Sequence, residues 1–203
     1  MGRKVQVTKE QMLEAGLQII IRDGYSQVSI KSVAAELSCS TSPIAWSFGS
    51  IQNFREELRR YAVEYMQKKM QGSGSDTLKN HRNTGEIYID MAIDEPNLIF
   101  FLREDESYLR SAGGIGFIFD KEKNAAIIDH LSSEMGISGE DAVSFIQAVT
   151  SYTEGIVSMI LSGVIPPDKE SAHRMAREGG AAFAMYYQMK GKGIPPQQIQ
   201  DNK

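Results

Sequence analysis

The chain of 203 residues is 41% hydrophobic and 24% charged, which is ordinary for a globular protein and excludes a disordered or fibrous class. Its longest apolar runs, at 97–102 and 156–161, are too short to cross a bilayer, and no apolar segment follows the basic N-terminus, so we expect a cytoplasmic protein. The single cysteine, Cys39, excludes an intramolecular disulfide and a cysteine-based zinc site.

The net charge of −4 is unevenly distributed along the chain. The first 60 residues hold eight Lys/Arg and six Asp/Glu and carry +2, whereas the remainder carries −6. This asymmetry favours an N-terminal end that faces phosphate, although a solvated surface would show the same pattern.

The first predicted helix covers about Lys9–Asp23. Thr8 and Gln11 have the spacing of a capping box, in which each side chain satisfies a free backbone donor of the other. Gly24 suits the positive φ that often follows a helix end. One apolar stripe runs between these two signals and consists of Leu13, Leu17, Ile20 and Ile21.

Two short helices follow, separated by the small residues 38–40. Ser29 is expected to cap a second helix over about Ile30–Leu37, which buries Val33, Ala34 and Leu37. Ser40 is expected to cap a third helix, with Pro43 in its first turn. Its inward residues are Ile44 and Phe48. Helix, three-residue turn and helix together predict a helix-turn-helix.

The rest of the chain is also predicted to be helical. A fourth helix begins near Ser50, carries Phe54, Leu58, Tyr61 and Tyr65 at helical spacing, and ends at the flexible segment 72–75. Further helices are expected at about Asp76–Ile93, Pro96–Leu109, Lys121–Met135, Gly139–Leu161 and Lys169–Met189. Only 114–119 has a strand-like pattern, and it is short and lies in a loop, so the predicted class is all-α.

The register of the first 50 residues resembles the TetR (tetracycline-repressor-like) family of transcriptional regulators. The features that match, in order and without a gap, are Leu13, Ala15, Leu17, Gly24-Tyr25, Ser29, Val33-Ala34, Ser40, Ile44 and Phe48. The resemblance implies a three-helix DNA-binding domain at 1–49, a larger helical effector-binding and dimerisation domain at 50–190, and a frayed tail at 191–203. Beyond the first domain, the chain matches the family only in the number and lengths of its helices.

Four positions depart from the family pattern. Ala45 stands where a tyrosine is typical, Ser47 replaces a common histidine, and Ile51 replaces a lysine that usually points at phosphate. Each change removes a potential backbone contact. Ser38 replaces a frequent turn glycine. We therefore expect DNA contacts that are weaker than, or rearranged from, those of the family.

The predicted third helix projects small polar side chains outward and can enter a major groove, where Ser and Thr can bond base edges or phosphates. Ser29 and Lys31 would add a helix N-terminus and a cation that face phosphate, and Arg3 and Lys4 a nonspecific contact. Taken singly, the serines are as well explained as helix caps and Lys31 as a solvated residue. The expected DNA-binding set is Ser29, Lys31, Thr41, Ser42, Trp46 and Ser47.

The two long C-terminal helices are apolar on more than one face, so one face can serve the core and another a partner. On 139–161 one stripe comprises Val143, Ile146, Val149, Thr153, Ile156 and Ile160, and a second comprises Phe145, Tyr152 and Met159. The small residues 179–182 would allow close approach of another helix. By resemblance, such paired helices form a homodimer, which requires a pseudo-palindromic operator.

The resemblance also implies a pocket for a small-molecule effector. Its candidate wall residues are apolar or aromatic, although ordinary core packing is the better explanation for any one of them. They are Met91, Phe100, Phe101, Phe117, Tyr152 and Met159. If the effector favours a spacing of the two recognition helices that does not match successive major grooves, its binding would weaken the affinity for DNA, because the two binding equilibria are coupled.

Other chemistry has little support in the sequence. His81, His130 and His173 lie far apart without metal-ligand spacing, and 113–116 lacks the Lys-Ser/Thr of a phosphate loop, so no metal or cofactor is expected. No nucleophile-base or paired-carboxylate arrangement predicts an enzyme. The leading interpretation is a ligand-responsive regulator, most simply a repressor; the alternative is a helical ligand-binding or scaffold protein that has lost specific DNA binding.

Overall fold

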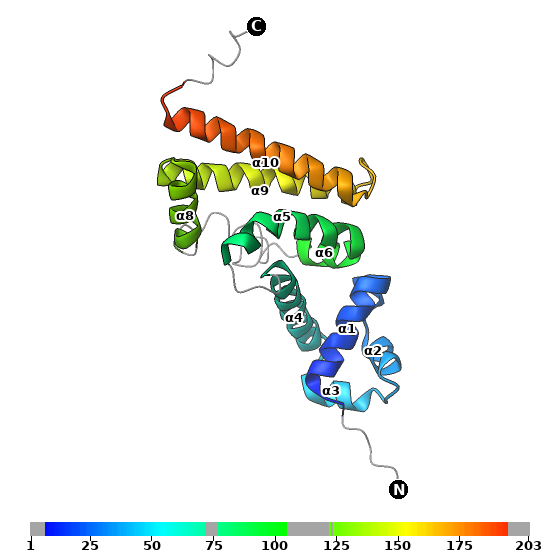
Figure 1. The fold of residues 1–203 in the computed structure, drawn as a ribbon. Helices are drawn as coiled ribbons and strands as arrows, with labels where there is room; N and C mark the ends of the chain where they lie inside the picture. The colour runs from blue at the N-terminus through cyan, green and yellow to red at the C-terminus, as the bar shows by residue number, and fades with distance from the viewer. Residues whose placement is uncertain (1–6, 72–76, 105–121, 123, 195–203) are drawn as a thin grey trace. The chain divides into compact units, whose positions relative to one another are not determined.

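The computed structural model describes residues 7–71, 77–104, 122 and 124–194, with the backbone alone for residues 71 and 77–83. These residues form helices and no strand, which confirms the all-α class (Figure 1). They divide into two compact units: unit 1 comprises residues up to 70 together with 94–106, and unit 2 comprises 71–93 and the residues from 107 onward. Each unit is described by itself below. The strand-like segment 114–119 lies outside the described residues.

Helix α1 spans Lys9–Asp23, as predicted. The Gln11 amide donates to Thr8 Oγ1 at 3.2 Å, and the Thr8 amide donates to Gln11 Oε1 at 2.9 Å, so the capping box is formed. Gly24 ends the helix with a φ of +88°, a value that costs glycine little because it has no Cβ. Leu17 and Ile20 are fully buried, as the periodicity predicts.

A 3-10 turn at Tyr25–Gln27 leads to α2, Ile30–Glu36, and then to α3, Ser42–Phe48. Helix α2 ends one residue before its predicted end. The expected cap of α3 by Ser40 is wrong, because Thr41 is the N-cap and makes no side-chain capping bond. A cap at Ser40 would place Pro43 at the third helical position, where the side chain needs a backbone N–H that proline lacks.

Two further helices complete unit 1. Helix α4 spans Ile51–Gln71, and α6, Pro96–Arg103, packs against α1. Gly16 of α1 allows α4 to approach closely, since a Cβ there would lie 3.0 Å from Phe54 Cζ. Polar contacts also join these helices: the Tyr61 hydroxyl donates to Glu14 at 2.8 Å, and Arg59 donates to the Phe101 carbonyl at 3.2 Å.

Unit 2 contains four helices among its described residues: α5 at Thr77–Asp94, α8 at Ala125–Met135, α9 at Gly139–Leu161 and α10 at Lys169–Gly191. Helix α9 has its predicted bounds, α8 begins four residues later than predicted, and α10 extends two residues further. Helices α9 and α10 lie side by side, and α8 packs on α9 (Figure 1).

Aromatic side chains form much of the contact between α9 and α10. Phe145 meets Tyr187 edge-on with ring centroids 6.2 Å apart, and Tyr152 meets Phe183 in the same manner at 5.9 Å. The second apolar stripe of α9 therefore faces α10 of the same chain. Gly179 makes this possible, because a Cβ at this position would lie only 2.3 Å from Tyr152 Cε1.

A group of charged side chains joins α5 to α10. His173 Nε2 lies 2.9 Å from Asp90 Oδ1, and Arg177 donates to Glu86 at 2.7 Å. His173 Nδ1 is also 4.0 Å from Glu86 Oε2. These polar pairs connect α5 to α10.

In the part of the chain that the structure describes, no helix has the length and apolar character needed to span a membrane. The same residues contain no group of three or more His, Cys, Asp or Glu side chains arranged to hold a metal ion.

Candidate nucleic-acid interface

The connection between α2 and α3 is a tight turn built on Ser38. This serine has a φ of +50°, the only positive φ among the described non-glycine residues. The left-handed conformation costs an L-residue about 1–2 kcal/mol, which explains why a glycine would fit here. The turn is closed by the Cys39 amide, which donates to the Ala34 carbonyl at 2.9 Å.

The inward side of α3 is firmly packed. Ile44 is fully buried and Phe48 is 5% exposed, as the sequence predicted. Phe48 contacts Phe54 of α4 edge-on, with ring centroids 4.9 Å apart. On α2, Val33 and Ala34 are buried as well. These inward contacts hold α3 on α2 and α4 in a single orientation and do not involve the residues on its outer side.

The outward side of α3 is exposed and uncharged. Trp46 is 86% exposed, the highest value among the large hydrophobic side chains described. Ser42 precedes it by four residues and shares its face of the helix. Thr41, Ala45 and Ser47 are exposed too. The structure therefore brings four of the predicted DNA-binding residues together on one short helix, namely Thr41, Ser42, Trp46 and Ser47.

The remaining two predicted contacts, Ser29 and Lys31, lie at the start of α2. Ser29 Oγ accepts from the Ser32 amide at 3.0 Å, and the Ser29 amide donates to Ser32 Oγ at 2.9 Å. Ser29 therefore caps α2, which is the structural role that the sequence also allowed. Lys31 is exposed and forms no ion pair with any described residue. It is the stronger candidate for a phosphate contact.

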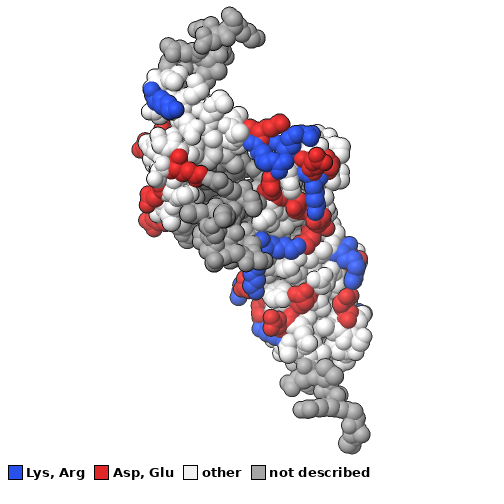
Figure 2. All heavy atoms as spheres, viewed as in Figure 1, with Lys and Arg blue, Asp and Glu red and all other residues white. Residues whose placement is uncertain are grey.

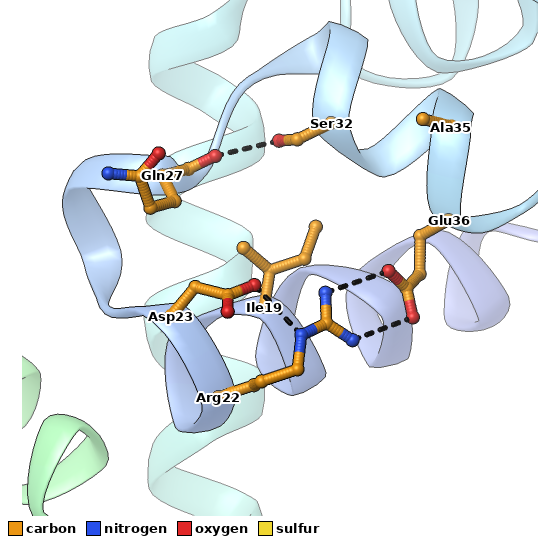
Figure 3. A pocket seen from close by; sticks show the side chains of 7 residues that line it. All are labelled: Ile19, Arg22, Asp23, Gln27, Ser32, Ala35 and Glu36. Carbon is orange, nitrogen blue, oxygen red and sulfur yellow. Dashed lines mark hydrogen bonds and ion pairs between the residues drawn. The ribbon is translucent and has the colours of Figure 1, made fainter.

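An arginine brace connects α1 to α2 and was not predicted. The Arg22 guanidinium crosses a hollow between the two helices and binds both oxygens of Glu36, at 3.0 and 3.2 Å (Figure 3). Its Nε donates to Asp23 at 2.9 Å. The hydrogen bonds from Arg22 lower the pKa of Glu36 below its ordinary value. Fourteen residues separate Arg22 from Glu36, so no helical spacing rule could pair them.

The brace positions α2 and leaves little cationic character in the hollow. Two carboxylates already occupy the Arg22 guanidinium, so an incoming anion would have to displace both. Arg55, at the start of α4, is by contrast exposed, lies 5.6 Å from the Tyr25 ring centroid, and forms no ion pair with the described residues. It is a second candidate for phosphate, missed from the sequence because the family motif does not include it.

The positions that depart from the family pattern have distinct environments. Ala45 is exposed and offers only a methyl group, while Ser47 is exposed and offers a hydroxyl. Ile51 is half-buried at the first position of α4. On the face shown in Figure 2, the end of unit 1 that carries α3 is mostly white, with few charged side chains in view.

The candidate effector residues are distributed over both units. Phe101 of unit 1 is buried against Tyr25, with ring centroids 4.6 Å apart, and its neighbour Phe100 is 48% exposed. In unit 2, Met91 is buried on α5, whereas Tyr152 and Met159 of α9 are half-buried. Phe117 lies outside the described residues. Packing within unit 1 accounts for Phe101, whereas Tyr152 contacts Phe183 of α10 and keeps part of its surface exposed.

In unit 1 the Arg22 brace ties α2 to α1, and α3 follows α2 with its outer face exposed and uncharged. Two exposed cations, Lys31 and Arg55, lie near α3 in the sequence. Such a surface can contact a duplex without further rearrangement of its core. No protein-family model matches the sequence, and no curated protein shows significant similarity to it.

Proposed function

We propose that this protein is a ligand-responsive transcriptional regulator of the TetR type that binds DNA as a homodimer. The observation that carries the proposal is the division of α3 into two sides. Ile44 and Phe48 fix the helix from within, and Thr41, Ser42 and Trp46 are exposed on its outside. A helix held in this way is a means of presenting side chains to another surface.

The dimensions of α3 suit a major groove. An α-helix is about 10–12 Å across with its side chains, which fits a groove roughly 12 Å wide, and the seven residues of α3 extend for about 10 Å along it. Lys31 on α2 and Arg55 on α4 supply cations for the phosphates that border the groove. Helix α2 packs on both α1 and α3, so it would lie across the backbone as the first helix of a helix-turn-helix does.

Dimerisation is proposed through the faces of α9 and α10 that the described residues leave uncovered. Met185 is 63% exposed and Tyr186 38% exposed, both on α10. A Cβ at Gly155 of α9 would meet no atom of the described residues within 4 Å. Along α9 and its C-cap runs a row of small residues spaced by three and four, half-buried in the first half and exposed in the second, which consists of Ser144, Ala148, Ser151, Gly155, Ser158 and Ser162. Small residues allow close approach of a partner helix.

In this proposal, unit 2 binds the effector, and Met91, Tyr152 and Met159 are its candidate contacts. Their side chains are apolar or aromatic, which suits a hydrophobic or planar molecule. An effector that favours one arrangement of the dimer changes the affinity for DNA by some factor. DNA must then change the affinity for the effector by the same factor, because coupling between two binding sites is reciprocal.

The deciding experiment is DNA binding by the purified full chain. Trp46 is the only tryptophan, so fluorescence excited at wavelengths that the tyrosines do not absorb reports this site alone. We expect salt-dependent binding to duplex DNA from upstream of its own or neighbouring genes, with protection of Trp46 from acrylamide quenching. Two cations per protomer give a slope of log K against log salt of about −4 for a dimer. Absence of binding to these duplexes at low salt would refute the proposal.

The second candidate function is a helical ligand-binding or scaffold protein without specific DNA binding. It is favoured by Ala45 and Ile51, which offer phosphate neither a hydrogen bond nor a charge. It predicts that replacing Thr41, Ser42 and Trp46 together changes no DNA property, while dimerisation and ligand binding persist.

A further inference from the structure

The outer face of α3 has an unusual chemical composition for a surface that contacts DNA. Ser42–Phe48 contains neither a charged nor a carboxamide side chain. Its largest exposed group is the Trp46 indole, at 86%, and beside it in sequence stands the exposed methyl group of Ala45. Thr41, exposed at the N-cap, adds a second methyl and a hydroxyl.

These groups limit which bases α3 can recognise. Guanine is read mainly by Arg or Lys, adenine by Asn or Gln, and cytosine by Asp or Glu. None of these residue types occurs on α3, and the hydroxyls of Thr41, Ser42 and Ser47 can bond several base edges without selecting one base. Thymine differs from the other bases by a 5-methyl group in the major groove, which is recognised by apolar contact. Of the four bases, it is the one whose distinguishing group matches the indole and methyl groups of this helix.

We infer that α3 recognises thymine through its 5-methyl group, with Trp46 as the main contact and the methyl groups of Ala45 and Thr41, which share the adjoining face of the helix, as further contacts. This inference rests on the proposed DNA-binding function and deepens it by naming the operator class: duplexes whose half-sites carry thymines at the positions facing α3. Lys31 and Arg55 then position the helix by phosphate contact but contribute no sequence information.

The test begins with the full chain and a random duplex pool, from which bound sequences are selected. Each thymine of the selected duplex is then replaced by deoxyuridine, which removes the 5-methyl group and leaves the base-pairing edge unchanged. We expect thymine enrichment in the selected half-sites. We also expect about a fourfold loss of affinity for each contacted methyl that is removed, the equivalent of one buried methylene.

Variants assign the effect to α3. Trp46→Ala is expected to bind thymine and deoxyuridine duplexes with nearly equal affinity, whereas Trp46→Phe retains part of the difference. Since Trp46 is so exposed, neither change removes core packing, and unaltered helix content and melting temperature confirm this. Val164→Ala, which truncates another exposed apolar side chain (70% exposed) outside the proposed DNA-binding surface, serves as the matched control and should keep the full discrimination.

The two levels of the hypothesis fail in different ways. Specific binding that is indifferent to deoxyuridine, or that depends instead on guanine N7, would overturn thymine recognition while leaving DNA binding intact. Discrimination that persists unchanged in Trp46→Ala would overturn the role of α3. Failure to select or bind any duplex would overturn the proposed function itself.

Discussion

Two adjacent glycines of α10 allow the packing of α9 on α10 to be tested by the same substitution with opposite expected effects. A Cβ at Gly179 would lie 2.3 Å from Cε1 and 2.6 Å from Cδ1 of Tyr152, whereas a Cβ at Gly180 would meet no atom within 4 Å. Gly180→Ala should therefore stabilise the chain by about 0.8–1 kcal/mol through helix propensity. Gly179→Ala gains the same helix propensity, but its new Cβ must displace the Tyr152 ring.

The cost of that displacement follows from what holds the ring. Tyr152 packs edge-on against Phe183 at 5.9 Å, so the ring cannot move away without loosening a second aromatic contact. Overpacking of this kind costs about 1–3 kcal/mol. The two alanine variants should thus differ by about 1–3 kcal/mol in free energy of unfolding, with Gly179→Ala the less stable.

The assay is urea unfolding followed by far-ultraviolet circular dichroism, at protein concentrations where the midpoint no longer changes, because association raises apparent stability. A double-mutant cycle isolates the contact. In a Tyr152→Ala background, Gly179→Ala should become as favourable as Gly180→Ala. Equal stability of the two single variants, or a penalty at Gly179 that survives removal of the Tyr152 ring, would refute the packing described for α9 and α10.

Three further predictions concern single side chains. Ser38→Gly should stabilise the chain by up to about 1 kcal/mol, since it relieves a φ of +50°; a lower melting temperature would contradict this. Burial and the hydrogen bond to Glu14 raise the pKa of Tyr61 to about 12 from 10.0. Its contribution to stability should therefore be complete below pH 10 and be lost between pH 10 and 12, and the ultraviolet titration difference between wild type and Tyr61→Phe should be centred near 12 rather than 10. Asp90→Asn should accelerate hydrogen exchange in α5, because His173 loses a charged partner at 2.9 Å; unchanged exchange would show that the pair does not hold α5.

The sequence predicted what depends on neighbouring residues along a helix. The ends of α1 follow from the Thr8 and Gln11 capping box and from Gly24, and α9 was placed correctly from its period. Burial of Ile44 and Phe48 followed in the same way. Each of these features is fixed by groups within four residues of one another, which is the range over which helical spacing rules apply.

What the sequence did not predict depends on residues that are distant in the chain or on a local conflict. The Arg22–Glu36 brace and the Asp90–His173 pair join different helices, and no local rule pairs them. The start of α3 was misplaced because Pro43 removes the amide that a cap at Ser40 would need. The second stripe of α9 had two possible partners, and Tyr152 faces α10 because Gly179 leaves it room.

The pairing of cations in unit 1 has a consequence for how the proposed regulator would work. Arg22 is bound to Asp23 and Glu36, and Lys9 is bound to Glu57. These pairs reduce the charge available for phosphate, so nonspecific affinity should be low and specificity must come from the fit of α3 in the groove. A coupling free energy of about 1–3 kcal/mol, ordinary for an allosteric effector, would lower DNA affinity some 5- to 150-fold.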